Sequence, residues 1–173
     1  MHAFDYVVVL FSFVYAAAIT HVLGTVGDLI IAGRRVKVSW INLGWMLIAV
    51  FSILSWWLST WELRELRTWD PPFILFNFVM ACALYILSRL TCPHVAPEGA
   101  IDLPAFHREQ GRKYLTAWAI FSAVGLTYNA AYDLASHGSY FLRQDIVVLP
   151  MTLVAAVAAI FVRQPRIQAA CLT

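Results

Sequence analysis

Five long apolar segments, separated by short polar ones, dominate the pattern along this chain. They cover about residues 4–32, 40–60, 73–90, 114–135 and 145–162. Because a helix rises about 1.5 Å per residue, roughly 20 apolar residues cross the ~30 Å hydrocarbon layer of a bilayer. The pattern therefore predicts an all-α fold, in which residues 1–173 form a single integral membrane domain with five transmembrane helices.

The polar connections differ in their content of basic residues. Nine of the twelve Lys and Arg residues fall on one side of the predicted membrane: Arg34, Arg35, Lys37, Arg89, Arg108, Arg112, Lys113, Arg163 and Arg166. Cytoplasmic loops of membrane proteins carry an excess of Lys and Arg. The distribution therefore predicts an N-terminus outside, a C-terminus inside and a cytoplasmic loop over residues 91–113.

Composition agrees with a membrane protein, because 61% of the residues are hydrophobic and 13% are charged. Soluble domains have roughly 45–50% apolar and about 25% charged residues. The net charge of +2 is too small to indicate a nucleic-acid partner. The first residues carry Asp5 and no Lys or Arg, unlike a signal peptide, so we expect the first span to be retained.

The three cysteines do not form a motif. They are odd in number and no CxxC pattern is present, so neither a disulfide framework nor a zinc site is predicted. Cys92 and His94 stand close together in a polar segment, but a second pair of ligands is missing. We predict no metal site, and the sequence requires no cofactor.

Deep in the first apolar segment lie His21 and Asp28, two residues that a membrane helix rarely tolerates, with Thr20 beside His21. Ionisable residues within a span usually face the protein interior. His21 and Asp28 are seven residues apart and therefore lie on nearly the same helix face. We expect them to line the inner part of an ion or ligand path. In the alternative, His21 is a neutral histidine bonded to a neighbouring helix and Asp28 pairs with the basic loop.

A second group of residues lies at the opposite, outer side. An aromatic outer pocket is predicted from Trp56, Trp57, Trp61 and Tyr128. Polar residues at similar depth, Asn77, Asn129 and Asp133, would line the outer part of the path. Such a pocket suits a small ligand or a cation. The alternative is the ordinary aromatic belt, in which Trp and Tyr gather at both membrane interfaces.

Small residues in the fourth segment predict close helix packing. Ala119 and Ala123 form a small-xxx-small pair. The pair would serve internal packing or contact with another subunit. Five short spans leave much helix surface exposed, so we expect a homo-oligomer or docking onto a larger membrane complex.

Several function classes are disfavoured because the sequence lacks residues that they require. Lys37 and Lys113 are the sole lysines and neither lies deep in a span, which argues against a retinal protein. A bilayer haem with two histidine ligands lacks a second histidine at the depth of His21, although ligation of a haem or pigment by His21 alone stays open. No Walker, GxSxG or HExxH motif is present, which makes an enzyme a weaker prediction.

The N-terminal third resembles a known group of sequences. The residues that carry the likeness are Asp5-Tyr6, the run Ile19-Thr20-His21-Val22-Leu23, Trp40 and the pair Trp56-Trp57. Over roughly the first sixty residues, the chain resembles a family of small, functionally uncharacterised bacterial membrane proteins. The resemblance implies a multi-pass protein of the bacterial inner membrane, and it implies no activity.

These observations leave three functional hypotheses. The first is a non-enzymatic, oligomeric membrane protein that conducts or binds a small ion or solute through a polar intramembrane site. The second is an accessory subunit of a larger membrane complex, such as a redox or pigment assembly. The third is an interfacial membrane enzyme. The first hypothesis predicts that spans one and four face each other or a symmetry axis.

Overall fold

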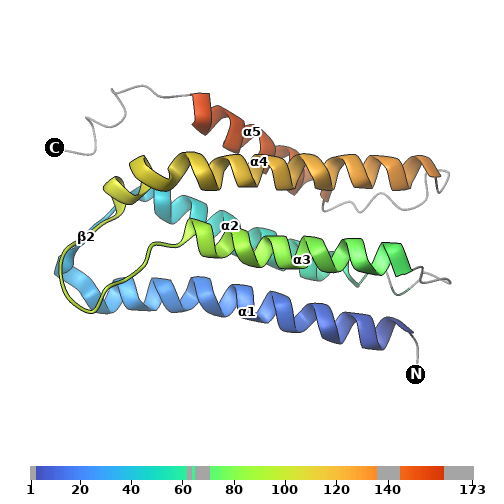
Figure 1. The fold of residues 1–173 in the computed structure, drawn as a ribbon, viewed down its shortest axis with the longest axis horizontal. Helices are drawn as coiled ribbons and strands as arrows, with labels where there is room; N and C mark the ends of the chain where they lie inside the picture. The colour runs from blue at the N-terminus through green and yellow to red at the C-terminus, as the bar shows by residue number, and fades with distance from the viewer. Residues whose placement is uncertain (1–2, 62–63, 65–70, 136–144, 162–173) are drawn as a thin grey trace.

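The structure is a computed structural model that describes residues 3–61, 64, 71–135 and 145–161. Within these residues the chain is helical, with five α-helices running lengthwise in alternating directions (Figure 1). The helices are α1 (Ala3–Ala32), α2 (Trp40–Ser59), α3 (Pro71–Thr91), α4 (Leu103–Ala135) and α5 (Asp145–Phe161). The predicted all-α class is therefore confirmed.

Three segments are long and apolar enough to cross a bilayer: Phe4–Arg35, Trp40–Ser59 and Pro71–Thr91. They correspond to the first three predicted spans and support an integral membrane protein. The fourth predicted span lies within α4, whose first turns are polar, and the fifth coincides with the 17-residue α5. Within the part of the chain that the structure describes, three of the five predicted spans therefore meet the requirements of length and composition.

Exposed tryptophans mark both ends of α2. Trp40, at its first residue, is 78% exposed, and Trp57, near its last turn, is 45% exposed. Their separation of 17 residues corresponds to about 26 Å along a helix axis. Tryptophan is enriched at both membrane interfaces. The spacing is therefore that of a helix whose two ends lie at the two edges of the hydrocarbon layer.

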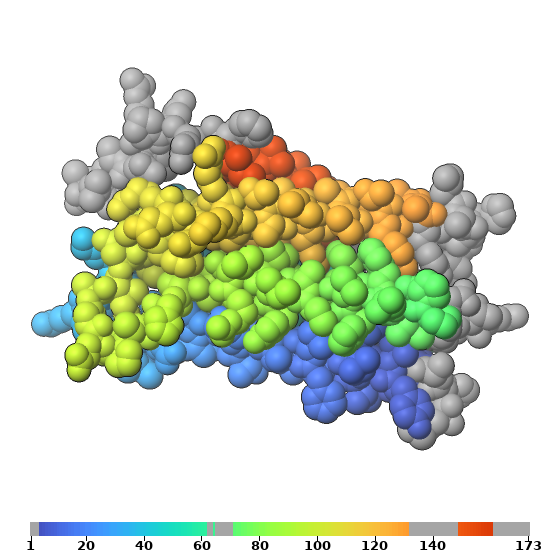
Figure 2. Space-filling view, viewed as in Figure 1, coloured from blue at the N-terminus to red at the C-terminus, as the bar shows by residue number. Residues whose placement is uncertain are grey.

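The helices pack in two main pairs, α1 against α3 and α4 against α5, while α3 also packs against α4 and α2 contacts all four of the other helices. Side chains of α3 (green) lie between α1 (blue) and α4 (yellow to orange) in Figure 2. Within a single copy of the chain, spans one and four therefore do not face each other, and their facing a symmetry axis stays a prediction. The buried core includes Phe11, Val22, Met46, Leu84 and Trp118.

The helices begin where the local sequence favours a start. Ser39 caps α2, because its Oγ accepts a hydrogen bond from the backbone N–H of Asn42. Pro71 and Pro72 open α3, where the first N–H groups have no partner within the helix. The predicted cytoplasmic loop over residues 91–113 is helical in its second half. Residues 103–113 form the first turns of α4 and are continuous with the fourth predicted span.

A short clip joins the two connections at one end of the bundle. β1 (Val36–Lys37), which follows the 3-10 turn η1 (Gly33–Arg35), pairs in parallel with β2 (Ile101–Asp102). The Lys37 amine lies 3.1 Å from Oδ2 of Asp102. Arg35 donates a hydrogen bond to the backbone carbonyl of Pro97 at 2.7 Å. The clip holds the α3–α4 connection against the α1–α2 connection.

Candidate functional site

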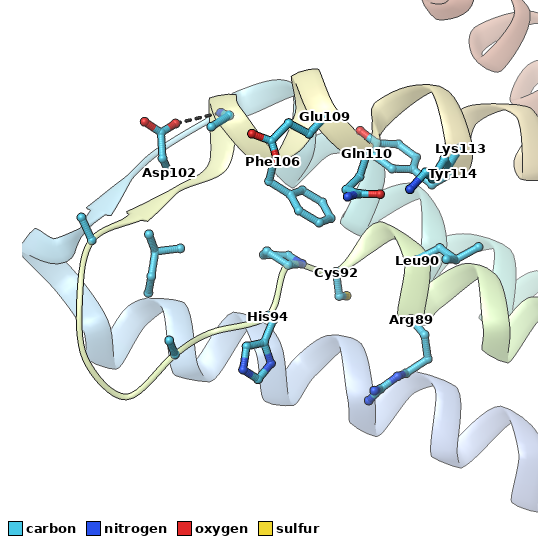
Figure 3. Close-up of a pocket in the computed structure, with 15 residues that line it drawn as sticks. Arg89, Leu90, Cys92, His94, Asp102, Phe106, Glu109, Gln110, Lys113 and Tyr114 are labelled. Carbon is cyan, nitrogen blue, oxygen red and sulfur yellow. Dashed lines mark hydrogen bonds between the residues drawn. The ribbon is translucent and has the colours of Figure 1, made fainter.

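A pocket of about 510 Å³ lies at the clip end of the bundle, where α3 ends and α4 begins (Figure 3). Its walls come from three segments: the last residues of α3, the connection that follows and the first turns of α4. We call it the end pocket. Its polar lining residues are Arg89, Cys92, His94, Asp102, Glu109, Gln110, Lys113 and Tyr114. Leu90, Pro93, Ile101 and Phe106 contribute apolar surface.

A buried hydrogen-bond network fixes the α3 wall. The hydroxyl of Thr91 donates to the carbonyl of Leu87 at 2.8 Å and accepts from Nε1 of Trp118 at 3.0 Å. Nδ2 of Asn42 donates to the carbonyl of Thr91 at 3.2 Å. Asn42, Thr91 and Trp118 are fully buried. The network therefore joins the end of α3 to α2 and to α4 directly behind the pocket.

Asp102 fixes the α4 wall. Its Oδ1 accepts from the backbone N–H of Ala105 at 2.8 Å, as an N-cap does, and its Oδ2 pairs with Lys37. These interactions, with the Ala105 bond first, lower the pKa of Asp102. Although Asp102 lines the pocket, one of its oxygens holds the start of α4 and the other pairs with Lys37 of β1.

The Asp102 cap gives a pH-dependent contribution to stability. Because its folded pKa is lowered, the contribution is complete above the unfolded value of about 4 and is lost as the pH falls through the lowered folded pKa. We expect Asp102→Ala to lower the thermal midpoint at pH 7 by about 2–4 °C. The midpoints of wild type and variant should converge below pH 4. Glu98→Ala, which removes an exposed carboxylate from the same connection, is the control and should have no effect.

Arg89 connects the predicted site on α1 with the end pocket. Its Nη1 donates to Nδ1 of His21 at 3.2 Å, and Figure 3 shows its side chain turned toward α1. His21 is half-buried, and its imidazole accepts this bond as the neutral form does. This geometry matches the alternative in which His21 ties two helices together. It places His21 beside the pocket without making it part of the lining.

The other predicted path residues on α1 do not face the bundle. Thr20 and Asp28 are exposed, on the side of α1 that no other described helix covers. Gly24, between them, is equally open, since a Cβ added there would meet nothing within 4 Å. The structure therefore does not bring Thr20, His21 and Asp28 together around one interior path.

The predicted outer polar residues lie toward the opposite end. Nδ2 of Asn77 donates to the carbonyl of Phe73 on its own helix at 2.9 Å. Asn129 is half-buried and has an interaction of its own. Asp133 belongs to the last turns of α4, and its side chain lies outside the described residues. α3 lies between α1, which carries His21, and α4, which carries Asn129. The two residues therefore do not line one shared path within a single copy of the chain.

The predicted aromatic pocket is divided among different surroundings. Trp56 is buried and packs against Phe121 at a ring distance of 5.4 Å. Tyr128 stacks on Phe76 at 3.7 Å. Two tryptophans are exposed: Trp57 donates to Ser12 at 3.3 Å, and Trp61 lies under the guanidinium of Arg64 at 5.3 Å. The exposed pair fits the aromatic-belt alternative.

The two alanines of the predicted small-residue pair differ in their exposure. Ala119 is half-buried and Ala123 is exposed. The closer approach of α4 to its neighbours occurs at Gly125, where an added Cβ would lie 3.1 Å from Leu149 of α5. Packing through small residues is present in α4, but Gly125 is the position that permits it.

Cys92 does not have the properties of a nucleophile. It is buried beside the pocket, and burial raises the pKa of its thiol to about 11. Reactive cysteines are thiolates with a lowered pKa. Within the described part of the chain, no three His, Cys, Asp or Glu residues are grouped as metal ligands would be. The side chains that line the pocket therefore favour binding of a ligand through charge, hydrogen bonds and apolar contact.

Sequence reasoning missed the end pocket, because it predicted a cytoplasmic loop over residues 91–113 without predicting how these residues are arranged in space. A signal was present in the sequence. Asp102 stands three residues before Ala105 as a capping residue does, and Glu109 and Lys113 are spaced as helix neighbours.

Comparison of the chain with protein-family models, with curated proteins and with solved structures gave no match.

Proposed function

We propose that this protein is a non-enzymatic integral membrane protein that binds a small charged solute or headgroup in the end pocket. The observation that carries the proposal is the pocket itself. Its volume of about 510 Å³ lies within the range of roughly 300–1,000 Å³ typical of ligand sites. Its lining combines apolar side chains with a few charged and hydrogen-bonding groups, as ligand sites do.

The proposal includes a membrane arrangement. All five helices cross the bilayer, with the N-terminus outside and the end pocket at the cytoplasmic surface of the bacterial inner membrane. In support, α4 has 33 residues, which span about 50 Å, so it is long enough to cross the bilayer and still extend beyond it. The excess of Lys and Arg at the clip end supports the orientation.

Binding is favoured over conduction by the placement of the polar side chains. Thr20 and Asp28 face away from the bundle, and His21 is held by Arg89. Binding is favoured over catalysis by the protonated thiol of Cys92. In addition, among the described side chains, His94 forms no hydrogen bond with a pocket carboxylate, as an acid–base pair would.

Filling the pocket tests the proposal. Ala105 lines the end pocket, so Ala105→Phe places a ring in its volume while leaving the backbone N–H that Asp102 accepts. Ala130, exposed near the other end of α4, provides the control Ala130→Phe. Native mass spectrometry of protein purified in mild detergent measures bound small molecules by mass.

We expect wild type and Ala130→Phe to carry the same non-covalent adduct and Ala105→Phe to lose it. A folded Ala105→Phe protein that keeps the full adduct would overturn the proposal. Wild-type protein with no adduct, even after incubation with membrane extract, would overturn it as well.

A further inference from the structure

The charges of the end pocket are not all equally available to a ligand. Asp102 is engaged by Lys37 and by the N-terminus of α4, and Arg89 is directed toward His21. Glu109 and Lys113 are exposed on α4 and take part in no ion pair within the described residues. The pocket therefore presents one carboxylate and one amine that remain available.

The separation of these two groups is informative. Glu and Lys four residues apart on a helix commonly form a pair, yet here they do not. Figure 3 shows the Glu109 carboxylate and the Lys113 amine apart, with the amide of Gln110 between them. One helical turn separates their positions by about 6 Å along the axis. A ligand that satisfies both groups must carry two opposite charges at some distance from each other.

The surroundings indicate an amphiphilic ligand. Phe106 and Leu90 supply apolar surface, and Leu90 is exposed at the end of α3, a helix long and apolar enough to cross a bilayer. The pocket thus lies where lipid headgroups are found if α3 crosses the membrane. Amphiphiles place charged groups at this depth and apolar chains beside the helices.

We infer that the end pocket binds a ligand with a phosphate ester and a primary ammonium group, as in a phosphoethanolamine headgroup. This inference rests on the proposed function of the pocket. Lys113 and the amide N–H of Gln110 contact the phosphate oxygens, and Glu109 accepts hydrogen bonds from the ammonium group. The positive charge of Arg89 adds favourable potential for the phosphate.

Related ligands fit less well. An α-amino acid carries both charged groups on the same carbon, so they are closer together than the two charges of phosphoethanolamine and suit the separated Glu109 and Lys113 less well. A choline headgroup has no N–H to donate to Glu109. A glycerol headgroup carries no cation, so it leaves the carboxylate of Glu109 beside an anionic ligand. The pocket should therefore rank ethanolamine above choline and glycerol headgroups.

Charge-matched variants test this assignment. Lys113→Gln is compared with Arg112→Gln, which removes the neighbouring exposed charge that does not line the pocket. Glu109→Gln is compared with Glu98→Gln, an exposed carboxylate outside the lining. Binding of ethanolamine, choline and glycerol phospholipids is measured by titration into detergent-solubilised full-length protein with native mass spectrometry. Soluble phosphoethanolamine is added as a competitor.

We expect Lys113→Gln to weaken binding of the ethanolamine lipid about tenfold, the size of one charge-assisted hydrogen bond. Glu109→Gln should weaken it by a similar factor and remove the preference over the glycerol lipid. Both control variants should bind as wild type does. Displacement by soluble phosphoethanolamine identifies a free headgroup as sufficient, and its failure identifies the whole lipid as the ligand.

Two outcomes overturn the inference. One is equal binding of the three lipids by wild type. The other is equal weakening by Lys113→Gln and Arg112→Gln, which indicates attraction by surface charge alone. An adduct that Ala105→Phe removes, but whose mass contains no phosphate and ammonium group, leaves the proposed function intact and refutes the ligand class.

Discussion

Replacement of Trp118 by alanine is expected to lower the free energy of unfolding by about 3–5 kcal/mol. The side chain is fully buried, so its removal leaves a cavity among α2, α3 and α4. It also deletes the hydrogen bond to Thr91 and the ring contacts with Trp45 and Phe121. Unfolding by SDS in mixed micelles measures the change.

The matched control is Trp40→Ala, which removes the same side chain from a position that is 78% exposed. We expect little change in unfolding for this variant. Equal destabilisation by the two substitutions would contradict the burial of Trp118 and the network behind the pocket. The Trp118→Ala variant should also lose the adduct, because the end of α3 is no longer held in place.

Replacement of Gly125 by leucine is expected to cost about 1–3 kcal/mol, because it overfills the contact between α4 and α5. A Cβ at this position would lie 3.1 Å and 3.3 Å from the two methyl carbons of Leu149, and 3.5 Å from the ring of Trp56. The longer leucine side chain has no room without displacing one of these residues. The thermal midpoint and the SDS unfolding curve report the loss.

Gly24→Leu controls for the change of residue type. A Cβ at Gly24 meets nothing within 4 Å, and leucine favours a helix more than glycine does. We expect Gly24→Leu to keep or slightly raise the stability of the single chain. If Gly125→Leu were as stable as Gly24→Leu, the described packing of α4 on α5 would be wrong.

The sequence was sufficient to predict the apolar parts of the helices, but not the side of each helix that is buried. Apolar runs marked α1, α2 and α3 because their length is set by the bilayer. In a membrane helix the lipid-facing side is as apolar as the packed side, so hydrophobicity does not separate them. Phe11 is buried and Phe13 is exposed on the same helix.

The same reason explains the outcome for the polar residues. Thr20 and Asp28 were expected inside because polar groups usually avoid lipid, yet both are exposed in the single chain. The end pocket lies within residues 89–114, and it was missed because the sequence does not show how this stretch folds back on itself. Which connection lies against which depends on the clip between β1 and β2, and two-residue strands give no periodic signal.

The clip also has a consequence for biogenesis. Lys37 and Asp102 are 65 residues apart in the chain, and α2 and α3 lie between them. During translation, β1 is synthesised well before β2. It can pair with β2 only after α3 has been synthesised and its C-terminal end lies at the same end of the bundle as β1. Pairing of the two strands therefore requires that the first three helices have already been assembled. A pulse-labelled chain with cysteines at these two positions would cross-link only after that stage of synthesis.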